Sequence, residues 1–276
     1  MHRKGKNIQM WVFLIIAVVM VVVSLFPEWF APNDPYTTNV MRIKEAPSSE
    51  FPFGTDALGR CVFSRVIYGA QTSIFAALAL VFITAVLGTV VGVLCGYYSG
   101  LADRVVMRGI DGLMAFPQMV LAIAVVGIMG GGMANAMLAL GFSSWMPYAR
   151  LARSRVISVK KEEFVQAARL SGCSDFAIMW RYIFPSVFSS LLAYAATQIG
   201  IIMLGFAGLS FLNLGVQSPQ AEWGSMISEA RGMIVTAYWT VLYPALALVL
   251  TVMLFNYLGD ALRDKLDVRE IEGFKP

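Results

Sequence analysis

Long stretches without Asp, Glu, Lys or Arg dominate this sequence. A helix needs about 20 mostly apolar residues to cross the hydrocarbon core of a bilayer, so stretches of this kind indicate membrane spans. The sequence therefore predicts an all-α polytopic membrane protein with six transmembrane helices, at Met10–Phe26, Thr72–Tyr98, Gly112–Gly130, Met133–Ala149, Ser186–Ser210 and Trp239–Gly259. The glycines at 130–132 favour a tight hairpin between the third and fourth spans.

The composition narrows the possible classes of protein. Of the 276 residues 58% are hydrophobic and 14% are charged, whereas a soluble domain has about 25% charged residues. This excludes a soluble enzyme, a disordered chain and a nucleic-acid-binding module. The one histidine is His2, and the three cysteines form no CxxC pair. We therefore expect no metal site, no disulfide framework and little acid–base chemistry.

Lys and Arg concentrate in alternate segments between the predicted spans. With the N-terminus inside, the cytoplasmic segments hold 16 of these residues and the external segments hold five. Cytoplasmic loops carry such an excess, so both termini are predicted to be cytoplasmic. We divide the chain into residues 1–71, a transmembrane helix with an external loop, and residues 72–276, a five-helix core with a cytoplasmic loop at 150–185.

The cytoplasmic loop contains the signals of two short helices. A helix is expected from Glu162, with acidic residues in its first turn, and Gly172 is placed to end it. Ser174 is a candidate N-cap of a second helix, and Pro185 is expected to mark the return to the bilayer. An apolar, small-residue helix exposed to water usually has a partner.

A stripe of small residues lies within the second predicted span. Thr84, Gly88, Gly92 and Gly96 recur at every fourth position, which places them on one face of a helix. Such a face allows another helix to approach closely, so we interpret the stripe as a packing surface.

Motifs that would make this chain an enzyme are missing. The sequence contains no GxxxxGK[ST] phosphate loop, no HExxH zinc motif and no GxSxG nucleophile elbow. Spans two to six hold no acidic residue well inside the bilayer, which argues against a proton-coupled pump or an intramembrane protease. A membrane-embedded enzyme stays an alternative class of protein, although the sequence offers no candidate catalytic residue for it. Gln118, beside Pro117, and Gln198 are the best candidates to line a pathway.

The cytoplasmic loop resembles the EAA loop of ABC importer membrane subunits. It keeps Ala167, Ala168, Gly172 and Pro185 at the spacing of that motif, with Gln166 in place of Glu. Further stretches resemble the dipeptide/oligopeptide/nickel permease family. These stretches include Phe53–Asp56, Gly59-Arg60, Ser64-Arg65, Ser210–Val216, Ala221–Gly224 and Phe255–Asp264. Within that family, the resemblance to the nickel-transport C-type subunit is slightly greater than the resemblance to the peptide permeases.

The resemblance implies a fold and a set of partners. The fold would be that of an ABC type I importer permease in the bacterial inner membrane, and the chain itself would be no enzyme. Its partners would be a homologous second permease subunit, two cytosolic ATPases that use ATP and Mg²⁺, an extracytoplasmic substrate-binding protein and the lipid bilayer, with no nucleic acid. This chain would bind no cofactor.

The resemblance also implies roles for residues and a solute. Contact with the ATPase would involve Glu163, Gln166, Ala167, Ala168, Gly172 and Pro185. Docking of the binding protein outside would involve Asp56, Arg60, Glu222 and Trp223. The solute would be nickel or a nickel chelate, and the alternative within the family is a dipeptide or oligopeptide.

Overall fold

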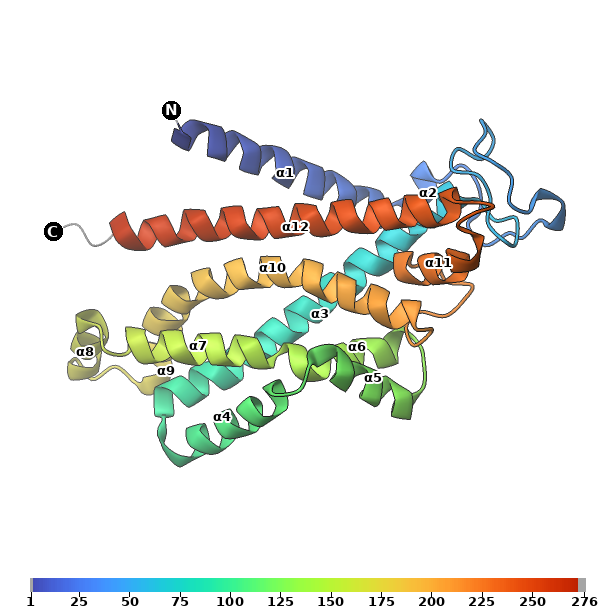
Figure 1. Cartoon of the computed structure of the whole chain (residues 1–276). Helices are drawn as coiled ribbons and strands as arrows, with labels where there is room; N and C mark the ends of the chain where they lie inside the picture. Colours follow the sequence, from blue (N-terminus) through green and yellow to red (C-terminus); the bar gives the residue numbers. More distant parts are fainter. Residues whose placement is uncertain (1, 273–276) are drawn as a thin grey trace.

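The computed structural model describes the backbone of residues 2–272 and the side chains of residues 10–265. The described chain is built of helices joined by loops (Figure 1). The long elements are α1 (His2–Leu25), α3 (Val62–Tyr98), α4 (Gly100–Met114), α5 (Gln118–Met129), α6 (Met133–Ser144), α7 (Met146–Val159), α10 (Phe184–Phe211) and α12 (Trp239–Glu272). The short ones are α2 (Pro27–Phe30), η1 (Val40–Arg42), α8 (Glu163–Leu170), α9 (Asp175–Ile178), η2 (Met179–Ile183), α11 (Trp223–Ala230) and η3 (Arg231–Met233).

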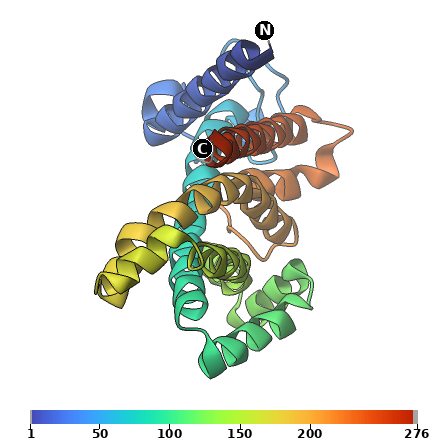
Figure 2. The same cartoon turned by 90° about the vertical axis from the view of Figure 1, so that its left-hand side faces the viewer.

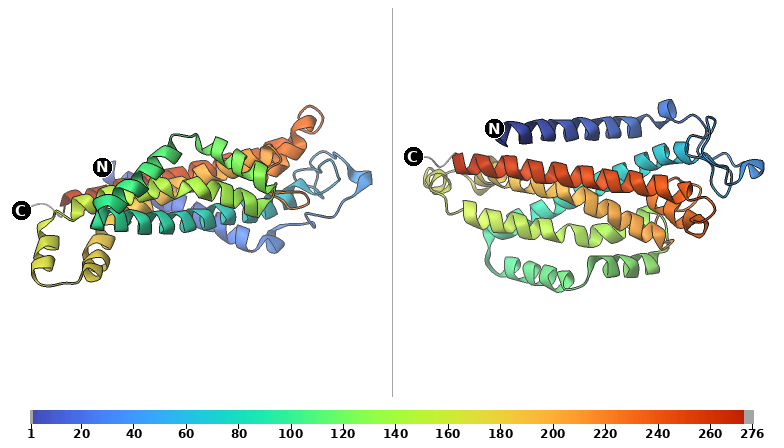
Figure 3. Two further views of the ribbon diagram at one scale, coloured as in Figure 1. Left: turned by 90° about the horizontal axis from the view of Figure 1, so that it is seen from below. Right: turned by 45° about the horizontal axis from the view of Figure 1, so that its top comes forward.

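The helices run between two ends of an elongated bundle. α1, then α4 with α5, then α10 run in one direction, and α3, α6 with α7, and α12 run back (Figures 1 and 3). One end holds α8 and α9, the beginning of α1 and the far end of α12, and we call it the hairpin end. The other holds α11 and the loop between α2 and α3, and we call it the loop end. Figure 2 views the bundle from the hairpin end.

The apolar spans confirm the all-α membrane fold but not every predicted boundary. Within the described residues, three helices are by themselves long and apolar enough to cross a membrane: Val62–Tyr98, Asp175–Phe211 and Trp239–Lys265. A fourth candidate is the pair α4 and α5, and the apolar part of α1, Met10–Leu25, is shorter. Length and composition of single helices therefore give three or four spans, fewer than the six predicted.

The third predicted span, Gly112–Gly130, is not one helix. α4 ends at Met114 and α5 begins at Gln118, with a bend of 88° between them. Pro117 lies in the break, where it lacks an amide hydrogen and disfavours a helical conformation for Phe116. A run of apolar residues satisfies a hydropathy criterion whether or not its backbone can stay helical.

Two other helix boundaries differ from the predicted ones. α3 begins at Val62 rather than Thr72, so the proposed division after residue 71 falls inside a helix. α7 continues to Val159 past the predicted end of the fourth span at Ala149. The connection that was predicted to begin at Arg150 therefore begins at Lys160.

The small-residue stripe packs α3 directly onto α7, as predicted. A Cβ atom added to Gly88 would lie 2.3 Å from the carbonyl oxygen of Trp145, and one added to Gly92 would lie 2.3 Å from that of Ala149. At Gly96 the nearest atom would be the Val156 Cβ at 2.9 Å. These distances leave no room for a side chain, so glycine is what allows the two helices to meet.

Candidate functional sites

The cytoplasmic-loop prediction corresponds to a helical hairpin, α8–α9, that projects at the hairpin end (Figures 1 and 3). Gly172 ends α8 with a φ of +80°, a conformation that favours glycine, and the amide of Cys173 donates to the Ala168 carbonyl at 3.2 Å. The Ser174 hydroxyl accepts from the amide of Ala177 at 3.3 Å. The predicted helix stop and N-cap are both confirmed.

Pro185 lies in the first turn of α10, near the predicted return to the bilayer, but it does not separate α10 from the hairpin. α9 continues through η2, a π-helical turn, into α10, and the whole stretch Asp175–Phe211 forms one candidate span. The Phe184 amide donates to Met179, five residues earlier. This wider turn precedes the proline and accommodates its ring and its missing donor. The hairpin is consequently continuous with α10.

The outer surface of the hairpin is partly apolar. Phe164, Leu170, Phe176 and Trp180 are all exposed, and Leu170 reaches 90%. Of the six residues assigned to ATPase contact, five are exposed: Glu163, Gln166, Ala167, Gly172 and Pro185. Ala168 is buried against the bundle and so supports the hairpin from inside. Exposed apolar area of this kind marks an interaction surface.

Gln166, the main departure from the EAA pattern, has a structural role. Its side-chain amide donates to the carbonyl oxygen of Lys160 at 3.0 Å and closes the turn that leads into α8. An ionised glutamate has no donor for this bond. The substitution therefore stabilises the entry to the hairpin in a way that the family's usual residue does not.

The hairpin is also attached to the end of α3. Tyr97 donates to Asp175 at 2.5 Å and accepts from Arg169 at 3.3 Å. The bond to Tyr97 raises the pKa of the Arg169 guanidinium above its ordinary value.

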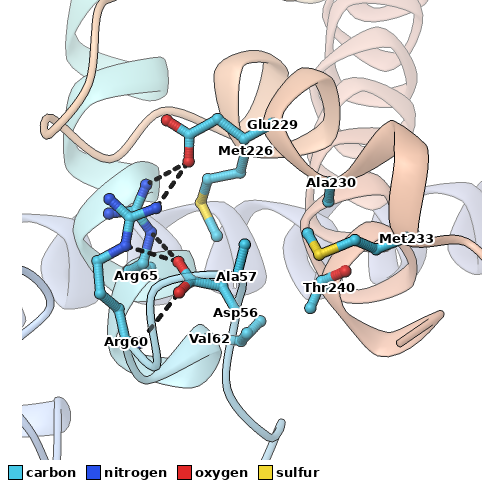
Figure 4. A pocket seen from close by; sticks show the side chains of 10 residues that line it. All are labelled: Asp56, Ala57, Arg60, Val62, Arg65, Met226, Glu229, Ala230, Met233 and Thr240. Atoms are coloured by element: carbon cyan, nitrogen blue, oxygen red, sulfur yellow. Dashed lines mark hydrogen bonds and ion pairs between the residues drawn. The ribbon is translucent and has the colours of Figure 1, made fainter. Parts of the chain in front are cut away.

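Four ionised side chains form a network at the loop end (Figure 4). Arg60 lies 2.6 Å from the Asp56 carboxylate and 2.8 Å from that of Glu229. Arg65 lies 3.7 Å from Asp56 and 3.4 Å from Glu229, and it donates to the Pro219 carbonyl at 3.2 Å. Two cations and two anions balance, which makes the burial of both arginines tolerable.

The residues predicted to dock an external protein are instead internal. Asp56 and Arg60 belong to the buried network. Glu222 is 2% exposed because its carboxylate caps α11, accepting from the amides of Gly224 and Ser225 at 2.8 Å each. Trp223 is 1% exposed, and its indole donates to the Val66 carbonyl at 2.9 Å. We therefore correct this assignment: all four hold the loop end together.

Sequence reasoning missed the partners that explain this burial. The motif that contains Arg65 implies no role for this residue, and no local pattern marks Glu229. The separation of Glu229 from Arg60 by more than half the chain hides the pair from any local pattern. The one available signal was the pair of arginines close to a single aspartate.

The two predicted pathway residues lie in different surroundings. Gln118 is exposed beside the α4–α5 bend, lines a pocket of about 280 Å³ and donates to the Ser144 hydroxyl at 2.9 Å. Gln198 is half-buried on α10. It is not among the residues that line this pocket. A pathway role for both therefore stays a proposal.

Comparison with known families decides what kind of protein carries these features. Residues 88–271 match the family described as binding-protein-dependent transport system inner membrane component. The chain belongs to this family. It is a permease subunit of an ABC importer, a multi-pass protein of the bacterial inner membrane, and not itself an enzyme.

Similar permeases extend the match over nearly the whole chain. The glutathione transport system permease proteins GsiD of Escherichia coli O6:K15:H31 and Shigella boydii serotype 4 are each 44% identical over 254 residues, covering 92% of this chain and 84% of theirs. GsiD of Pectobacterium atrosepticum is 41% identical over the same shares.

A solved structure agrees on the fold. A chain from the inward-facing MetNI methionine ABC transporter superposes with a TM-score of 0.55 and 16% identity. The match covers 70% of this permease and 94% of that chain. At this identity it supports the type I importer permease fold alone.

Proposed function

We propose that this permease forms half of a pathway that imports a small peptide, powered by ATP hydrolysis in partner subunits. The relatives reported above are named for glutathione, itself a small peptide, and their names do not mention nickel. The dipeptide or oligopeptide alternative therefore fits better than the nickel or nickel-chelate assignment that led in the sequence analysis.

The α8–α9 hairpin carries the coupling part of the proposal. It presents apolar side chains at the end of the bundle where Lys and Arg gather, which is the side expected to face the cytosol. Two ATPases would each receive one hairpin, from this chain and from a homologous permease. Because the hairpin continues into α10, a tilt imposed on it passes directly into the membrane bundle.

The remaining assembly follows from the same proposal. A substrate-binding protein would deliver the solute at the loop end, and ATP with Mg²⁺ would act only in the ATPases. Both termini would lie in the cytosol, since α1 begins and α12 ends at the hairpin end (Figure 1). Gln118 and Gln198 are the polar side chains that we propose for the pathway. Dividing the permease into residues 1–71 and 72–276 likewise stays a proposal.

Uptake measurements test the solute directly. A strain of the source organism that lacks this chain, and the same strain with the chain restored, would be given radiolabelled glutathione, a labelled dipeptide or ⁶³Ni²⁺. We expect restoration to return uptake of a peptide and not of nickel. Restored nickel uptake with unchanged peptide uptake would contradict the proposal and reinstate the metal assignment.

A further inference from the structure

Tyr97, next to the last residue of α3, contacts both helices of the hairpin. Its side chain is buried, with 3% of the residue exposed, although it lies at a helix end. The hydroxyl donates to the Asp175 carboxylate on α9 and accepts from the Arg169 guanidinium on α8. Both bonds involve a charged group, and bonds of that kind are stronger than neutral ones. A single phenol oxygen thus joins three helices.

Other parts of Tyr97 make contacts that do not involve the hydroxyl. Its backbone carbonyl accepts from the ammonium group of Lys160, which precedes α8. The Lys160 nitrogen lies 5.3 Å and the Arg169 guanidinium carbon 5.8 Å from the ring centroid, within cation–π range. The ring also packs in the apolar cluster formed with Val165 and Ile178. Removing the oxygen alone leaves these contacts in place.

α3 extends from this contact to the opposite end of the permease. It is a single helix of 37 residues, packed on α7 along the glycine stripe. Near its other end, Arg65 enters the buried ion network and Ser73 donates to Glu222 at 3.3 Å. The helix is therefore fixed at the loop end and held to the hairpin by Tyr97.

We propose that Tyr97 is a positioning residue for energy coupling, which ties the α8–α9 hairpin to α3 so that both move together. This inference rests on the proposed function. The hairpin is covalently joined to α7 and α10, whereas its attachment to α3 depends on contacts such as these. Without the hydroxyl, a movement of the hairpin would reach α10 but would be transmitted poorly to α3.

The first test measures coupling in the intact transporter reconstituted in proteoliposomes. We expect Tyr97→Phe to lower the amount of peptide transported per ATP hydrolysed by roughly tenfold, the scale of a hydrogen bond to a charged group. Tyr98→Phe removes the same atom from the adjacent residue, which is 60% exposed, and should leave the ratio unchanged. An unchanged ratio in Tyr97→Phe, or an equal loss in both variants, would overturn the inference.

A double-mutant cycle distinguishes one shared contact from two independent defects. Asp175→Ala removes the acceptor of the Tyr97 hydroxyl. If both substitutions act through the same bond, the double variant loses no more coupling than the more impaired single variant. Losses that multiply would show that the two residues act separately and would contradict the proposal.

A spectroscopic measurement tests the contact without relying on transport. Cys173 is exposed in the turn between α8 and α9, whereas Cys61 is buried. A nitroxide on Cys173, in a background with Cys95→Ala, should give a narrower spectrum in Tyr97→Phe and an unchanged one in Tyr98→Phe. Identical spectra would overturn the inference. If the unaltered transporter took up no solute with ATP, the proposed function would be refuted. The nitroxide spectrum would still show whether Tyr97 holds the hairpin to α3, because it does not depend on transport.

Discussion

A methyl group added to Gly92 tests the packing that orders the whole bundle. A Cβ atom there would lie 2.3 Å from the Ala149 carbonyl oxygen and 2.7 Å from the Ala152 Cβ. Ordinary van der Waals contacts begin at 3.4 Å, so α7 would have to move by about 1 Å. Because the obstructing oxygen belongs to the backbone of α7, no side-chain rotation relieves the overlap. Overpacking of this kind costs about 1–3 kcal/mol.

Gly109 in α4 provides the matched control. A Cβ atom added there meets nothing within 4 Å. Alanine is a better helix former than glycine by about 0.5–1 kcal/mol, so Gly109→Ala should be neutral or stabilising. The same chemical change is therefore predicted to have opposite signs at the two positions.

The assay is the thermal unfolding midpoint of the detergent-solubilised transporter, measured in parallel for Gly92→Ala, Gly109→Ala and the unaltered protein. We expect a lower midpoint for Gly92→Ala alone. A midpoint for Gly92→Ala that equals or exceeds that of Gly109→Ala would show that α3 and α7 do not approach as described.

Three further substitutions test the sites. Arg65→Met leaves the buried Asp56 carboxylate and the exposed Glu229 carboxylate with one arginine, and should destabilise the transporter by about 3–5 kcal/mol, measured by thermal unfolding. Gly172→Val forces a branched side chain into a left-handed conformation at a cost of about 1–2 kcal/mol. This variant should lose ATP-driven uptake but should still insert into the membrane, as measured by membrane fractionation. Gln166→Glu removes the donor to Lys160 and should cost about 0.5–1.5 kcal/mol of local stability, seen as faster amide hydrogen exchange in α8.

Controls accompany these substitutions. Arg42→Met removes an arginine from an exposed pair with Glu50, whose attraction solvent screens, so a loss as large as that of Arg65→Met would contradict the burial argument. Normal uptake in Gly172→Val would refute the role of the hairpin. Unchanged exchange in Gln166→Glu would show that its bond to Lys160 contributes nothing.

The fold was predictable where one property decides the outcome. Apolar length located the three long spanning helices, α3, α10 and α12. The capping residues Gly172 and Ser174 located the hairpin, because capping signals act within a few residues. The sequence did not predict the bend at Pro117, because the residues on both sides of it are apolar and together look like one span. The π-helical turn before Pro185 arises from a backbone adjustment that residue type does not reveal.

The candidate site was harder to predict because exposure depends on distant parts of the chain. A motif indicates which residues recur, and not whether they face solvent. The motif predicts Asp56 and Arg60 on an outer surface, yet both are buried and belong to an ion-pair network that includes the distant Glu229. The solute could not be predicted from these residues, because transport in this family depends on a binding protein and not on the membrane component alone.

Cross-linking from Cys173 tests the central claim most directly. This thiol is exposed at the tip of the α8–α9 hairpin. In intact transporter in its membrane, a short linker that reacts with a thiol and an amine should join Cys173 to a nucleotide-hydrolysing subunit, and only reagents supplied from the cytosolic side should reach it. Labelling from the external side, or a hairpin that forms no product with any ATPase subunit, would contradict the account.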